Sequence, residues 1–146
     1  MKGRPKITKF QLDDQKNEIY AFLGIVSAEA DYKLSFLLNK KLKLALKNVK
    51  NLDVAGENGS KLIFSRYSDT SGAPGITCNL ISNRSDKDYL LKKLKNIDYF
   101  FQVHSYGDNC NIEHITDSLR EIDLITAVFR LDPEDIKDKN LNYLTI

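Results

Sequence analysis

Residues 97–106 read IDYFFQVHSY, and this stretch decides the fold. Alternate side chains of a strand point to opposite faces, so Tyr99 and Phe101 share one face while Phe100 lies on the other. Large apolar residues therefore occupy both faces. The stretch predicts a strand with two apolar sides, and if helices cover only one of them, Phe100 leaves apolar area on the other.

The segments on either side of this strand extend the pattern. Helical spacing over 112–122 and an apolar run over 124–131 complete a β-α-β unit, whose outer strands are parallel in one sheet. Upstream, a continuous apolar run leads into a helix that Ser27 is expected to cap, and 45–60 is expected to be a connection. The remaining expected elements are strands over 7–13, 19–26, 61–69 and 75–82, and a helix over 28–43.

This order of elements predicts an α+β fold. We expect a mixed, mainly antiparallel sheet with two helices packed on one face, a variant of the ferredoxin-like split β-α-β arrangement. With 146 residues, 42% hydrophobic and 29% charged, the chain is expected to form one α+β domain over 1–146. Its composition excludes disordered and fibrous classes.

The chain has neither a membrane-length apolar run nor a disulfide framework. Its two cysteines, Cys78 and Cys110, are too few for a scaffold of disulfides, so we expect free thiols in a reducing cytoplasm and no membrane association. One disulfide between them is the open alternative.

Charge is distributed unevenly along the chain. Residues 1–96 contain 18 basic and 10 acidic side chains, whereas residues 97–146 contain 4 basic and 10 acidic ones, although the net charge is only +2. Two explanations stay open: a basic surface that binds a charged partner, or two halves that neutralise each other in the fold.

Residues 91–99, LKKLKNIDY, resemble the signature of the bacterial IPExxxVDY family. Asp98 and Tyr99 match that signature, Leu91 and Ile97 replace its Ile and Val, and lysines stand where it has Pro and Glu. Further similar stretches lie, in the same order as in the family, at 23–40, 82–85 and 131–134. The resemblance implies a small cytoplasmic single-domain protein and assigns no activity.

Three zinc-competent or nucleophilic side chains lie near one predicted strand-turn-helix junction. His104, Cys110 and His114 could form a thiol- or metal-dependent site, because a thiol just before a helix gains acidity from the helix dipole. A fourth ligand at suitable spacing is absent, so incidental surface and strand positions are the simpler interpretation. Residues 56–61, GENGSK, lack the spacing of a phosphate loop and predict a turn.

A second candidate set combines aromatic and basic residues. Sheets that bind single-stranded nucleic acid present aromatic side chains flanked by cations. The candidates here lie on the strands and in the basic segments 40–50 and 84–95; they are Phe100, Phe64, Arg66, Lys40, Lys41, Arg84, Lys92 and Lys93. Aromatic strand residues also form ordinary cores.

These observations favour a binding or homo-oligomeric interaction module without catalysis and without a cofactor. A homodimer or a protein partner would cover the apolar face of Phe100. Weak RNA binding through 40–50 and 84–95 is the alternative, and an activity centred on Cys110 comes third.

Overall fold

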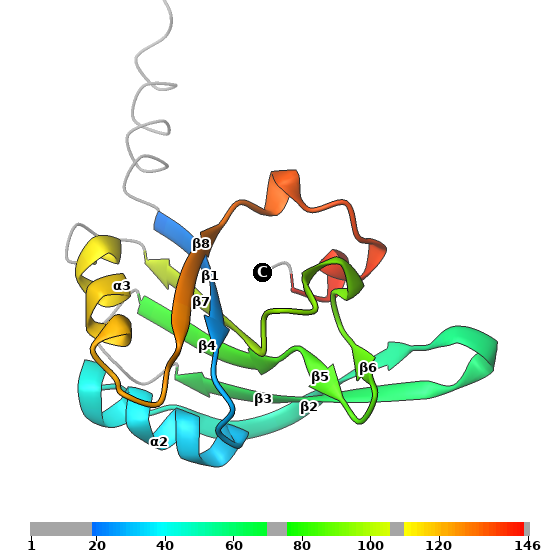
Figure 1. Ribbon diagram of the computed structural model, residues 1–146, viewed down its shortest axis with the longest axis horizontal. Helices are drawn as coiled ribbons and strands as arrows, with labels where there is room; N and C mark the ends of the chain where they lie inside the picture. Colours follow the sequence, from blue (N-terminus) through cyan, green and yellow to red (C-terminus); the bar gives the residue numbers. More distant parts are fainter. Residues whose placement is uncertain (1–18, 70–75, 106–109, 145–146) are drawn as a thin grey trace, which may run out of the picture.

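The computed structural model describes residues 19–69, 76–105 and 110–144, and most of its strands form one sheet (Figure 1). The sheet has six strands in the order β2-β3-β4-β7-β1-β8, and every neighbouring pair is antiparallel. The strands are β1 (Ile19–Val26), β2 (Lys47–Ala55), β3 (Lys61–Asp69), β4 (Ile76–Ser82), β7 (Tyr99–Ser105) and β8 (Ala127–Leu131). With helices α2 (Asp31–Leu42) and α3 (Ile112–Arg120), they confirm the α+β class.

Shorter elements lie between these. A two-stranded ribbon pairs β5 (Arg84–Ser85) with β6 (Asp88–Tyr89). Short 3₁₀ helices occupy Glu57–Gly59, Lys92–Leu94, Pro133–Asp135 and Lys139–Leu144. No helix within the described ranges is both long and apolar enough to span a membrane.

The connectivity contains the predicted split β-α-β unit. β7 and β8 both run antiparallel to β1, which lies between them, so these two strands are parallel to each other. The order β8-β1-β7-β4, with α2 following β1 and α3 following β7, is the ferredoxin-like arrangement. The β2–β3 hairpin extends this sheet beyond β4 and projects to the right in Figure 1.

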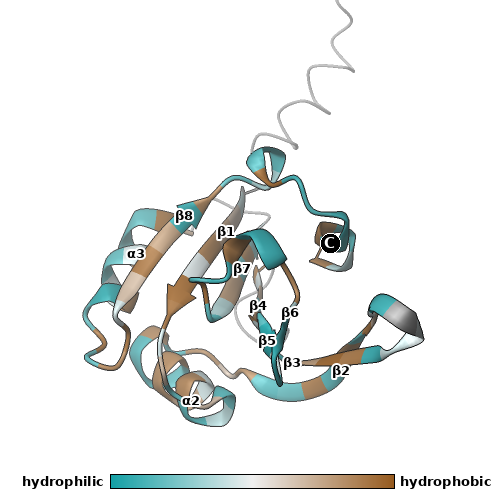
Figure 2. Cartoon of the chain, turned by 45° about the vertical axis from the view of Figure 1, so that its right-hand side comes forward, coloured by the Kyte–Doolittle hydropathy of each residue, from teal (hydrophilic) through white to brown (hydrophobic). Residues whose placement is uncertain are grey.

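Both helices pack on one face of the sheet, as predicted. Leu34 and Leu38 of α2 and Leu119 of α3 are fully buried in this layer. They contact the face that carries Phe101 and Val103, and the central strands are rich in hydrophobic residues (Figure 2). Burying an apolar stripe from each helix against the sheet stabilises this layer through the hydrophobic effect.

The opposite face of the sheet is also covered, which corrects the expectation of an exposed apolar surface. Phe100 and Phe64 are both 0% exposed, and the Phe100 ring stacks on Phe22 with centroids 5.2 Å apart. Two chain segments without long helices or strands supply the cover; they contribute Leu90, Leu91, Leu94, Ile97, Ile136, Leu141 and Leu144. Phe100 and Phe64 therefore belong to a second core and form no surface for a partner or a nucleic acid.

Residues 47–55 form a strand where a connection was expected. β2 is the edge strand of the sheet, and most of its side chains are exposed, so it lacks the alternation that marks a half-buried strand. Its register with β3 shifts between Val49 and Leu52, a bulge that further disturbs the pattern.

The start of α2 also differs from the prediction. Ala30 occupies the N-cap position, whereas the Ser27 hydroxyl donates to the Leu124 carbonyl at 2.8 Å and so ties β1 to the segment before β8. The predicted strand over 7–13 lies outside the described residues.

Candidate functional site

The predicted basic residues do not form one surface. Lys40 and Lys41 lie at the end of α2, in the layer on the helical face, whereas Lys92 and Lys93 belong to the segment that covers the other face. Arg66 lies on β3, and its Nε atom is buried without a hydrogen-bond partner among the described residues. The structure thus separates the two basic clusters by the thickness of the sheet.

Several of these cations pair with acidic side chains. Lys41 pairs with Glu121 at 2.6 Å, and Arg84 pairs with Asp98 at 2.5 Å. Both pairs join the basic part of the chain to the acidic part, so some of the charge asymmetry is neutralised internally. The Lys41–Glu121 pair is exposed and contributes little stability because solvent screens it, whereas Asp98 is buried.

The residues that carry the family resemblance are structural. Asn83 is 0% exposed; its side chain donates to the carbonyls of Leu94 and Ile97 and accepts from the Leu91 N–H at 2.8 Å. This amide holds the segment 90–97 in place over the second core. It is a position that a hydrophobic residue could not fill, since the backbone groups would lose their partners.

Asp98 and Tyr99 tie β7 to the start of the helical layer. Asp98 accepts from the Ser27 N–H at 2.9 Å, and the Tyr99 hydroxyl donates to the Glu29 carbonyl. Burial, reinforced by the charges of Asp31 and Asp98, raises the pKa of Tyr99 to about 12. A cavity of about 360 Å³ lies beside them, and the groups around it are engaged in these structural contacts.

The structure separates the three members of the predicted thiol or metal site. Cys110 and His114 line one cavity on the helical face, together with Cys78. His104 lies on the opposite face of β7, where its ring meets Tyr20 edge-on at 6.2 Å. No group of three or more potential metal ligands occurs in the described part of the chain, so this set does not form a metal centre.

The two thiols are also poor nucleophiles. Burial raises the pKa of Cys78 to about 12 and raises the pKa of Cys110 above its usual value. Desolvation thus opposes the predicted lowering of the Cys110 pKa by the α3 dipole.

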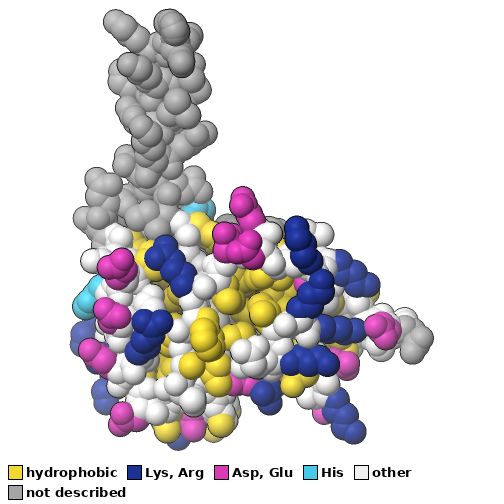
Figure 3. All heavy atoms as spheres, turned by 45° about the horizontal axis from the view of Figure 1, so that its top comes forward, with side chains coloured by type: hydrophobic (Ala, Val, Ile, Leu, Met, Phe, Trp, Pro, Cys, Tyr) yellow, Lys and Arg dark blue, Asp and Glu magenta, His cyan; other side chains and the backbone are white. Residues whose placement is uncertain are grey.

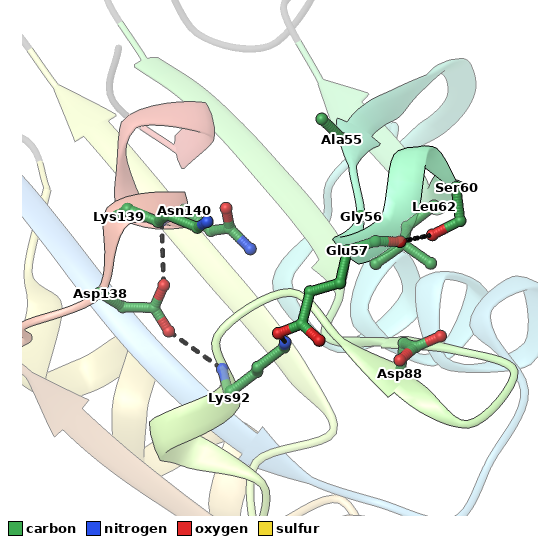
Figure 4. Close-up of a pocket in the computed structure, with 10 residues that line it drawn as sticks. All are labelled: Ala55, Gly56, Glu57, Ser60, Leu62, Asp88, Lys92, Asp138, Lys139 and Asn140. Atoms are coloured by element: carbon green, nitrogen blue, oxygen red, sulfur yellow. Dashed lines mark hydrogen bonds and ion pairs between the residues drawn. The ribbon is translucent and has the colours of Figure 1, made fainter.

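A polar cavity of about 290 Å³ lies where the β2–β3 turn meets the last 3₁₀ turn (Figure 4). The Lys92 ammonium pairs with Glu57 at 2.9 Å, and this contact lowers the pKa of Glu57 and raises that of Lys92. Asp138 accepts from the backbone N–H groups of Lys92 and Asn140 at 3.0 and 2.9 Å. These contacts fasten the C-terminal segment to the segment after β6, and sequence patterns gave no sign of them because the residues lie far apart in the chain.

No protein-family model matches this chain, and no curated protein matches its sequence. The resemblance to the IPExxxVDY family stays a prediction.

The two edges of the sheet differ in protection. The β2 edge carries the exposed residues Lys47 and Lys50 as well as the bulge, and both features discourage pairing with another strand. The β8 edge has no bulge in its register with β1 and exposes Phe129 at 44%. Sequence patterns predicted β8 as a strand, but its place at the edge depends on the tertiary fold.

A wide groove continues from the end of β8. It measures about 770 Å³ and is lined mainly by β1, β8 and the turn that follows; its residues are Tyr20, Ala21, Phe22, Arg130, Leu131, Asp132, Pro133 and Glu134. Figure 3 shows hydrophobic side chains gathered in the centre of the face turned to the viewer, with cations on both sides and acidic side chains above. The groove thus places apolar side chains of β1 beside the end of β8.

Proposed function

We propose that this protein is a non-catalytic, cytoplasmic interaction module that forms a homodimer by pairing its β8 edge with that of a second copy. The observation that supports this proposal is the contrast between the two edges: the β2 edge is protected, whereas β8 pairs with no further strand among the described residues and exposes an aromatic side chain. The cytoplasmic location is part of the proposal and agrees with the two free thiols.

The register of β8 defines which backbone groups are available. The Ile25 carbonyl accepts from Asp98 N–H, on the β7 side, so the even-numbered residues of β1 turn their backbone toward β8. Gly24 is opposite Phe129, which leaves Val128 and Arg130 with backbone groups directed outward. These two residues supply the donors and acceptors for a further strand.

A two-fold axis at Phe129 satisfies these groups. Antiparallel pairing about that axis places Val128 opposite the partner's Arg130 and makes Phe129 a non-hydrogen-bonded pair with the partner's Phe129. Side chains approach most closely in such pairs, and an aromatic pair contributes about 0.5–1.5 kcal/mol beyond its buried area. The edge is therefore complementary to itself in both backbone and side chain.

A side chain of α3 already contacts this edge. The Arg120 guanidinium donates to the Val128 carbonyl at 2.9 Å. A carbonyl oxygen has two acceptor positions, so this contact leaves one for the partner strand. Five residues form a short edge, and we expect an interface near the lower size limit, with a Kd in the micromolar range.

Light scattering coupled to size exclusion tests the proposal. At about 500 µM, where a micromolar Kd gives saturation, we expect twice the chain mass of 16.7 kDa. Arg130→Pro removes an outward N–H without touching the β1 ladder, and Phe129→Glu places like charges opposite each other, so both variants should be monomeric. Phe36→Glu, on the outer side of α2 with 63% exposure, is the matched control and should remain a dimer.

A wild-type chain that stays monomeric at this concentration, or a dimer that both edge variants retain, contradicts the proposal. The alternative of RNA binding has lost its aromatic platform because Phe100 and Phe64 are buried. A complex with RNA that weakens steeply with salt, in a chain that stays monomeric, would favour that alternative.

A further inference from the structure

The cavity beside Cys110 combines apolar walls with a cationic mouth. It measures about 310 Å³ and lies on the helical face, where α2 ends and α3 begins. The walls are formed by Leu42, Leu44, Ile76, Cys78, Phe101, Val103, Cys110 and Ile115. Besides the two thiols, the charged or titratable residues among the described lining are Lys41, Lys43 and His114, and none of the described lining residues is acidic.

Lys43 has an unusual backbone conformation at this mouth. Its φ of 58° and ψ of 46° are left-handed, at the C-cap of α2, a position that glycine adopts at the least cost. Its N–H donates to the Asn39 carbonyl, so the conformation is that of an ordinary helix end, yet a lysine occupies it.

Of the three groups that line the cavity, Lys43 is a cation without an ion pair among the described residues. Lys41 already pairs with Glu121 at 2.6 Å. Lys43 and His114 are both exposed, and an ammonium makes a stronger hydrogen bond to a carboxylate than a neutral ring nitrogen does. The Lys43 ammonium therefore supplies the cation, while the thiols, with their raised pKa values, line the walls as neutral groups.

We infer that this cavity binds a small amphipathic carboxylate, with its apolar tail between the helices and the sheet and its carboxylate at Lys43. The volume is at the lower end of the range for ligand pockets, which favours a short chain over a long-chain lipid. A cation at the mouth of an apolar cavity selects an acid over the corresponding alcohol.

Isothermal titration calorimetry with octanoate, and with octanol as the neutral probe, tests the inference. We expect octanoate to bind with a sub-millimolar Kd, about tenfold tighter than octanol. Lys43→Gly removes the cation while relieving the left-handed strain, so the variant folds and should weaken octanoate binding about tenfold. Lys50→Ala, an exposed lysine on β2, is the control and should bind as the wild type does.

Filling the cavity supplies an independent readout. Ile115→Trp should abolish octanoate binding, and bound octanoate should slow the alkylation of Cys110 by iodoacetamide in the wild-type chain. Undetectable octanoate binding, equal affinity for octanol, or unchanged binding in either Lys43→Gly or Ile115→Trp would overturn the inference. None of these outcomes depends on dimer formation, because the cavity lies away from β8.

Discussion

The Phe100→Ala variant tests whether Phe100 is a core residue or an interface residue. The Phe100 side chain is 0% exposed and stacks on Phe22 with ring centroids 5.2 Å apart. Removing a buried phenylalanine costs about 3–5 kcal/mol, because apolar burial is lost and a cavity remains. The lost aromatic pair accounts for about 0.5–1.5 kcal/mol.

Urea unfolding followed by circular dichroism measures this cost. A loss of about 4 kcal/mol, with a slope of about 2 kcal/mol per molar urea, lowers the midpoint by about 2 M. Such a loss is a large part of a total stability of about 5–15 kcal/mol. The dimer mass should not change in the part of the population that remains folded, since Phe100 is far inside the second core.

Phe36→Ala is the matched control. Phe36 is 63% exposed on α2, so its truncation should change the free energy of unfolding by about 0.5 kcal/mol or less. A Phe100→Ala variant that loses less than about 1 kcal/mol but falls apart into monomers would refute the assignment of Phe100 to the core.

Three further predictions concern the interior and one helix end. Asn83→Ala leaves three hydrogen bonds unmade, two of them buried and one partly buried, and should lower the Tm by about 10 °C in a thermal melt. Burial raises the pKa of Cys78 from 9.0 and that of Tyr99 from 10.0, each to about 12. Both groups ionise first in the unfolded chain, so stability is complete below pH 9 and should fall as the pH rises toward 12; a flat urea midpoint between pH 8 and about 11 would contradict this linkage. Lys43→Gly should raise the free energy of unfolding by about 0.5–1 kcal/mol, and a clear loss in the same urea titration would show that the left-handed conformation is not costly.

Elements with strong local patterns could be predicted from the sequence. β1 and β3 begin and end at the predicted residues because their apolar or alternating side chains match a buried or half-buried strand. The parallel relation of β7 and β8 follows from the crossover through α3, whatever strand lies between them.

The cover over Phe100 could not be predicted in the same way. The segments 90–97 and 131–144 have no helical or strand periodicity, and they are held by single contacts such as Asn83 with the Leu91 N–H and Asp138 with the Lys92 N–H. Contacts between residues 46 positions apart leave no local pattern in the sequence. A strand with two apolar faces therefore indicates burial on both sides as readily as an interface.

The candidate sites were predicted only in part for the same reason: local patterns do not show how distant segments pack together. Cys110 and His114 do lie together, but His104 alternates to the other face of β7, as the period of a strand requires. The open edge of β8 was not predicted because edge position is a property of strand order, which local patterns do not specify.

The most direct test of edge pairing is oxidative cross-linking of Phe129→Cys in a Cys110→Ser background. In the two-fold register, residue 129 faces its own copy in a non-hydrogen-bonded pair, where the Cα atoms lie about 4.5 Å apart and a disulfide is sterically allowed. We predict a covalent dimer on denaturing, non-reducing gels for Phe129→Cys and a monomer for Phe36→Cys in the same background. Equal cross-linking of the two variants, or none at position 129, would contradict pairing through β8.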